Sequence, residues 1–238
     1  MSTEKDFTLK NFLRGARLSL PILLGYLPVG FAFGVLAVQA GMEPLTAGLM
    51  CYFVYAGSAQ LIAAGLLANG ASVATVVITT FIVNLRHLLM SAALAPYLKH
   101  WSKTRQAWFC FEMTDETFAA NLSRFSSCGV NAGEAFGLNF FSHGAWTAGG
   151  ILGAFSDSAI GYMTYAGLDF ALPGMFIALL LPHFRLPRRL FAAGLGAALS
   201  LLFITMGIDQ WNILAATVCS ATLAAFWPVN KRRNDVRA

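Results

Sequence analysis

Long apolar runs constrain this chain more than any other feature of its sequence. A helix that spans a bilayer needs about 20 predominantly apolar residues, and the chain has several runs of that order. It is 57% hydrophobic and only 11% charged, whereas a soluble domain is about 25% charged. The sequence therefore predicts an all-α, polytopic membrane protein of about seven hydrophobic segments. These segments are 18–40, 45–68, 71–97, 133–155, 159–181, 190–207 and 211–228.

The basic residues lie mainly between these segments or outside them. Of the 16 Lys and Arg residues, all but Arg86 and Arg124 fall in four clusters, at 5–17, 99–105, 185–189 and 231–237. Loops rich in Lys and Arg stay in the cytoplasm. We therefore interpret the net charge of +5 as a topology signal, with both termini cytoplasmic, and expect no nucleic-acid partner.

No part of the chain has the composition of a separate soluble domain. We expect a cytoplasmic amphipathic lead-in at 1–17, a single transmembrane transporter domain at 18–228 and a basic cytoplasmic tail at 229–238. The lead-in is long and mixed in charge, which is not typical of a cleaved signal peptide.

The topology signal conflicts with a simple count of crossings. Three apolar runs lie between the basic clusters at 5–17 and 99–105, although two cytoplasmic flanks require an even number of crossings. One solution is a run that re-enters on the same side or breaks into half-helices, which survives at membrane depth only inside protein or beside a cavity. The other is that 106–131 crosses and one basic loop faces outward.

Two segments carry interruptions where such a break is expected. The first, Tyr55–Gln60, reads YAGSAQ, and Gly57 and Ser58 weaken the helix there. The second, 165–174, contains Asp169 and a helix-breaking proline. Both begin Tyr-Ala-Gly, which is either chance or a trace of the paired interruptions that mark a transporter's midplane site. Candidate substrate-binding residues here are Tyr55, Gly57, Ser58 and Gln60.

Glycines four positions apart in the sequence predict close helix packing elsewhere. The pairs are Gly30 with Gly34, Gly129 with Gly133 and Gly149 with Gly153. Such spacing lets two helix backbones approach closely inside a membrane.

Arg86 lies within the apolar sequence TTFIVNLRHLLMSAAL. An unpaired charge at the bilayer centre costs at least about 2.5–3.5 kcal/mol. The basic loop at Lys99 is about 20 Å of helix away, which is too far for the side chain to reach the interface. Arg86 therefore needs an anion, for which the candidates are Asp115, Glu116 or a substrate carboxylate. A static ion pair and a role in substrate binding both satisfy this requirement.

The neighbours of Arg86 add polar groups to the same region. His87 has a side chain that exchanges protons near neutral pH, which suits proton coupling, although a simple hydrogen bond is the alternative. Asn84 can brace either residue. Thr114 precedes Asp115 and Glu116 as a helix cap would, but these acids, like Asp169, are also candidates for binding a proton or a substrate ammonium.

Motifs for catalysis, metals or cofactors are not evident. The chain has no H-E-x-x-H, G-x-S-x-G or P-loop sequence. Ser142 and His143 are adjacent, which is poor geometry for a nucleophile and its base. The four cysteines form no C-x-x-C pair, so we expect neither disulfides nor a zinc site. We predict no enzyme activity, no metal and no cofactor.

Five motifs in order resemble the AzlC family, the large subunit of bacterial branched-chain amino acid exporters. The resemblance covers about residues 18–225. The motifs are LPVGFAFGVLA (27–37), YAGSAQ (55–60), NLRHLLMSAALAPYL (84–98), MTDETFA (113–119) and ALPGMFIALL (171–180).

The resemblance implies secondary export of leucine, isoleucine and valine, with methionine as a further candidate, across the bacterial cytoplasmic membrane. It also implies a small membrane partner of the AzlD type and energy from the proton gradient rather than ATP. From the residues, we expect the breaks and Arg86 to frame a site whose apolar walls include Phe31, Phe33 and Phe53. The alternatives are a non-transporting membrane scaffold, or a transporter or channel for another small solute.

Overall fold

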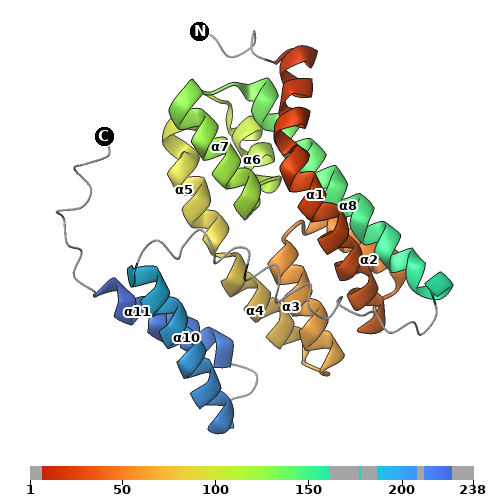
Figure 1. Ribbon diagram of the computed structural model, residues 1–238, viewed down its shortest axis with the longest axis vertical. Helices are drawn as coiled ribbons and strands as arrows, with labels where there is room; N and C mark the ends of the chain where they lie inside the picture. Colours follow the sequence, from red (N-terminus) through yellow and green to blue (C-terminus); the bar gives the residue numbers. More distant parts are fainter. Residues whose placement is uncertain (1–6, 161–176, 178–186, 208–211, 227–238) are drawn as a thin grey trace. The chain divides into compact units, whose positions relative to one another are not determined.

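The computed structural model describes residues 7–160, 177, 187–207 and 212–226 (Figure 1). These residues form helices and connecting turns without any strand, which confirms the all-α class. The chain forms two compact units, 1–173 and 174–238, each described by itself below. Helices of the first unit are α1 (Leu9–Gln39), α2 (Pro44–Phe53), α3 (Gly57–Ala68), α4 (Val73–Asn84), α5 (Arg86–Leu98), α6 (Lys103–Phe111), α7 (Asp115–Cys128) and α8 (Ala132–Ile160).

Two stretches are long and apolar enough to cross a membrane. They are α1 and the stretch Val73–Leu98, which joins α4 and α5. Only 17% of the most apolar part of Val73–Leu98 is buried inside the protein, and Leu88 and Leu89 are 69% and 73% exposed. A core helix of a soluble protein would bury such side chains. Their exposure therefore matches contact with lipid and agrees with a membrane protein.

Helices α1 and α8 run parallel to one another along a seam of glycines (Figure 1). A Cβ atom on Gly30 would lie 2.7 Å from the Trp146 carbonyl oxygen, and one on Gly34 would collide with that of Gly150. Only glycine permits this approach, so the close helix packing predicted from Gly30 and Gly34 is confirmed, whereas a Cβ atom on Gly129 would meet nothing within 4 Å. The same close approach occurs at Gly15, Gly137, Gly149 and Gly153.

The second apolar run is interrupted where the Gly-Ser sequence predicts it. Helix α2 ends at Phe53 and α3 begins at Gly57, and Tyr55 between them has a φ of 39°, which is unusual for a residue other than glycine. Gly48 of α2 faces Ile151 and the Tyr52 carbonyl faces His143, so α2 is antiparallel to α8. Figure 1 shows α3 leading away again beside α4.

The third apolar run contains an interruption that was not predicted. Leu85 separates α4 from α5, although its backbone stays right-handed, with φ −55° and ψ −21°. The two helices are therefore one kinked stretch, and Arg86 is the first residue after the kink. At its far end, Leu98 packs in a core with Trp101, Phe109 and Ala132, which brings α5 to the start of α8.

The second unit contains α10 (Pro187–Thr205) and α11 (Asn212–Ala225), which pack together as a hairpin. These helices confirm two of the predicted apolar segments. Ser220 lies 3.1 Å from the position of a Cβ on Gly196, so small residues set the spacing. The predicted interruption at 165–174, with Asp169, lies outside the described residues, as does the tail at 229–238.

Candidate functional site

Arg86 is held by two residues from other helices. Its Nη1 lies 2.6 Å from Oδ2 of Asp115, and its Nη2 donates a hydrogen bond to Oγ of Ser58 at 2.5 Å. The side chains of Arg86 and Asp115 are 30% and 29% exposed, so the pair is partly exposed rather than sealed in the core. The structure thus unites three residues predicted from separate motifs.

Each of these residues lies at a helix start. Ser58 is in the first turn of α3, Arg86 begins α5 and Asp115 begins α7. Thr114 caps α7, with Thr117 completing a capping box, which confirms the predicted helix start. The carboxylate of Asp115 is therefore stabilised by the positive end of α7 as well as by Arg86.

The start of α3 is buried, and its backbone N–H groups are available as hydrogen-bond donors. Ala56 is its N-cap residue but supplies no side-chain cap, so the first-turn N–H groups, which have no partner within the helix, can serve an anion. Gln60 is fully buried and its Oε1 accepts a hydrogen bond from Trp146 Nε1 at 2.9 Å. Its Nε2 has no partner among the described residues.

Glu116 contacts a residue that sequence reasoning missed. The Tyr26 hydroxyl donates to Glu116 Oε2 at 2.6 Å and also lies 2.6 Å from Thr114 Oγ1. The Tyr26 ring meets Tyr55 edge-on at 6.4 Å. A tyrosine in the middle of an apolar run was the available signal, because its hydroxyl needs a partner once buried.

The remaining predicted residues occupy the edges of this cluster. His87 Nδ1 lies 3.2 Å from the Asn84 carbonyl oxygen, which matches the simple hydrogen bond considered above. The Asn84 side-chain oxygen is buried and has no partner in the described part of the chain. Phe33 is buried and stacks on Trp146, whereas Phe53 is 63% exposed.

The cluster offers complementary charges to a small zwitterion. Arg86 can hold a carboxylate, while Asp115 and Glu116 can hold an ammonium, and buried amide and hydroxyl groups can complete the hydrogen bonds. Within the described residues no group of three His, Cys, Asp or Glu side chains could hold a metal ion. Ser142, considered above as a nucleophile beside His143, donates its hydroxyl hydrogen to the Leu138 carbonyl oxygen.

Comparisons with known proteins identify the family to which the chain belongs. The model of the AzlC protein family matches residues 21–160. The inner membrane protein YgaZ of Escherichia coli (strain K12) is 33% identical over 91% of this chain and 92% of that protein. An uncharacterized membrane protein of Archaeoglobus fulgidus is 30% identical over 90% of this chain and 94% of its own length.

The branched-chain amino acid transport protein AzlC of Bacillus subtilis (strain 168) is 27% identical over 83% of this chain and 78% of that protein. No solved structure matches the chain. The family match covers more than half of the sequence and includes Ser58, Arg86 and Asp115. The chain therefore belongs to the AzlC family of membrane proteins.

Proposed function

We propose that this protein is a secondary exporter of branched-chain amino acids in the bacterial cytoplasmic membrane. It acts as the large subunit of a complex with a small membrane protein of the AzlD type, and the proton gradient drives it. The observation that carries the proposal is the convergence of Ser58, Arg86 and Asp115 at three helix starts. The name of the Bacillus subtilis relative supports the substrate class.

The ion pair suggests how a zwitterion binds. An amino acid entering between Arg86 and Asp115 exchanges one ion pair for two, because its carboxylate binds the guanidinium and its ammonium binds the carboxylate. The net charge of the site does not change, so no unpaired charge is buried. The uncapped start of α3 adds N–H donors for the substrate carboxylate.

The same geometry supports a direction of coupling between protons and substrate. A proton on Asp115 neutralises the group that would hold the substrate ammonium, so proton and substrate compete for one site. Competition of this kind leads to antiport, in which an inward proton drives an outward amino acid. Binding of both together would instead drive uptake.

One observation favours a second candidate, a membrane scaffold. The Arg86 guanidinium already has two protein partners, Asp115 and Ser58, as expected of a static lock between helices. A scaffold would require only that the pair be intact, and it would carry no flux.

Leucine efflux tests the proposal. Cells preloaded with a leucine-containing dipeptide would express this chain with or without its small partner, and a parallel sample would receive an uncoupler. We expect efflux that needs both chains and stops when the gradient collapses. Efflux that survives the uncoupler would indicate a channel. No efflux of leucine, isoleucine or valine, with both proteins confirmed in the membrane, would overturn the proposed substrate class.

A further inference from the structure

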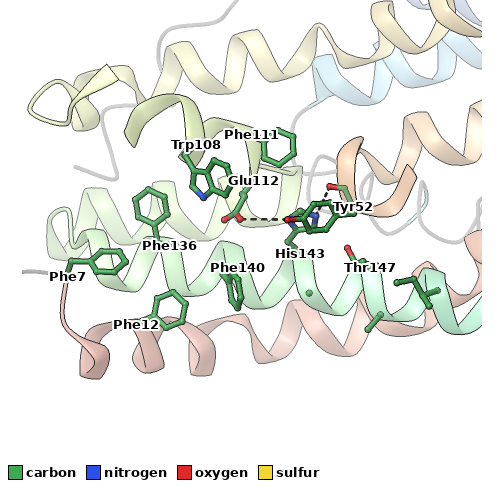
Figure 2. A pocket seen from close by; sticks show the side chains of 13 residues that line it. Phe7, Phe12, Tyr52, Trp108, Phe111, Glu112, Phe136, Phe140, His143 and Thr147 are labelled. Carbon is green, nitrogen blue, oxygen red and sulfur yellow. Dashed lines mark hydrogen bonds and ion pairs between the residues drawn. The ribbon is translucent and has the colours of Figure 1, made fainter. Parts of the chain in front are cut away.

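A second cluster of polar groups lies apart from Arg86, in a cavity of about 550 Å³. Glu112 from the end of α6 and His143 from α8 line it, and they are only 4% and 6% exposed. Figure 2 shows the two side chains pointing toward one another beside Tyr52. None of these residues belongs to the zwitterion site proposed above.

His143 does not donate a hydrogen bond to Glu112 in its neutral form. His143 Nε2 lies 3.0 Å from the Tyr52 carbonyl oxygen, so this nitrogen carries a hydrogen and donates it. The other nitrogen, Nδ1, lies 3.8 Å from Glu112 Oε1, which is longer than a hydrogen bond. In a neutral ring Nδ1 presents a lone pair, so the carboxylate needs another donor.

The cavity also contains oxygen atoms without a partner. Glu112 Oε2 and Thr147 Oγ1 are both buried and make no hydrogen bond within the described part of the chain, and both residues line the cavity. A buried oxygen that lacks a donor is costly, and a ligand with N–H groups would satisfy both. Two acceptors in one cavity therefore favour a ligand that donates hydrogen bonds.

The rest of the wall is aromatic. Tyr52 lines the cavity and stacks on the His143 ring at 5.3 Å between centroids, and Tyr55, which is not a lining residue, also stacks on that ring at 4.1 Å. Aromatic faces attract organic cations and also accept apolar groups. The other aromatic lining residues are Phe7, Phe12, Trp108, Phe111, Phe136 and Phe140 (Figure 2).

We propose that this cavity binds an apolar primary ammonium compound, with its charged group on Glu112 and its alkyl group among the aromatic side chains. A single carboxylate in an aromatic wall suits a monovalent organic cation, whereas a divalent metal ion requires several oxygen ligands.

Two kinds of molecule can supply the ammonium group and its apolar chain. One is the α-ammonium of an exported amino acid, an assignment that rests on the proposed function. The other is a free alkylamine without a carboxylate, which would bind whatever the protein transports. The probe 3-methylbutylamine, which is leucine without its carboxylate, separates the two when it is compared with leucine itself.

The titratable groups around the site are few. Glu112 comes from α6, His143 from α8 and Tyr52 from α2, and Tyr55 follows α2. The lining residues at the start of the chain and in α1 are phenylalanines. Among the described residues that line the cavity, Glu112 is the only carboxylate, so the ammonium group is assigned to it.

Titration calorimetry of the purified full chain with 3-methylbutylamine would test the proposal. We expect saturable binding of the amine and at least about tenfold weaker binding of the neutral isostere 3-methylbutan-1-ol, because the alcohol lacks the charge that Glu112 binds. Absence of amine binding, or equal affinity for the alcohol, would overturn the site.

Two variants test the residues. Glu112→Gln should weaken amine binding by at least about tenfold, since a charge-assisted hydrogen bond is lost, while Glu43→Gln on the exposed start of α2 is the matched control. Gly144→Leu keeps the charged pair but fills the cavity, because a Cβ atom at Gly144 meets nothing within 4 Å. It should also weaken binding. Wild-type amine affinity in Glu112→Gln or in Gly144→Leu would contradict the proposal.

A third variant keeps the two proposals distinguishable. Arg86→Gln should leave amine affinity unchanged and weaken leucine binding, so amine binding can succeed even if leucine export fails. If leucine binding also weakens in Glu112→Gln, the natural ligand of the cavity is the α-ammonium group of the exported amino acid. Leucine binding that is insensitive to Glu112→Gln would identify a free amine. Loss of amine binding in Arg86→Gln would contradict a separate site.

Discussion

At the scale of single residues, Gly57 allows the helix break and the polar cluster to coexist. It is the first residue of α3, and a Cβ atom there would lie 2.7 Å from Cη2 of Trp146. Trp146 in turn donates to Gln60. The side chain of Gly57 is therefore limited to hydrogen because any larger group would displace the indole that orders Gln60.

We predict that Gly57→Ala lowers the free energy of unfolding by about 1–3 kcal/mol, as overpacking usually does. Gly65→Ala is the matched control in the same helix, because nothing lies within 4 Å of its Cβ position and alanine favours helix. Thermal unfolding of the two variants in detergent would measure the difference. Equal melting temperatures would mean that Trp146 can move without cost.

Residues with charge in an apolar run could be predicted, whereas their partners could be identified only in part. Arg86 was identifiable because a lone guanidinium in lipid is costly, and this argument named Asp115 as one of three candidate partners, with Glu116 and a substrate carboxylate. Tyr26 and Trp146 were not identified, because they come from helices distant in sequence and only tertiary packing shows that they reach Glu116 and Gln60. The residue type of Tyr26 signals that its hydroxyl needs a partner once buried, but it does not identify that partner.

At the scale of elements, one interruption could be predicted and another could not. Gly57 and Ser58 weaken a helix by their own chemistry, so the break between α2 and α3 was visible in the sequence. The kink at Leu85 lies in FIVNLRHL, which contains neither glycine nor proline, so local propensity gives no signal there. The ion pair of Arg86 with Asp115 depends on packing against α7.

The arrangement of α2 and α3 leads to a prediction about sidedness. If the two helices enter and leave on one side, the turns that precede α2 and follow α3 both face the cell exterior. In a chain whose native cysteines are replaced, Met42→Cys and Ala71→Cys should then react with an impermeant maleimide added to intact cells. His100→Cys, in the basic turn after α5, should react only after the membrane is permeabilised.

The alternative topology makes the opposite prediction for one position. If the second apolar run crosses completely, Ala71→Cys would be protected in intact cells while Met42→Cys would still react. That pattern would contradict re-entry and would favour a crossing by 106–131.

At the scale of the whole first unit, the parallel seam of α1 and α8 organises the other helices. Both helices begin near the ion pairs of Glu134 with Arg14 and Arg124, and both begin beside residues that the charge pattern assigns to the cytoplasm. Glycine spacing predicted the close packing, but it could not predict which helices pair or in which direction. The seam brings Tyr26 and Trp146 together at the depth of the polar cluster.

Leucine efflux by a charge-swapped pair tests most directly whether the cluster binds substrate. Arg86→Asp and Asp115→Arg should each reduce thermal stability, because each leaves two like charges together. The double variant restores an ion pair, and we expect it to recover stability but to leave leucine efflux at the background level, since the substrate's carboxylate and ammonium would meet the wrong partners. Efflux by the double variant at the wild-type rate would contradict the account and would make the pair a static lock between α5 and α7.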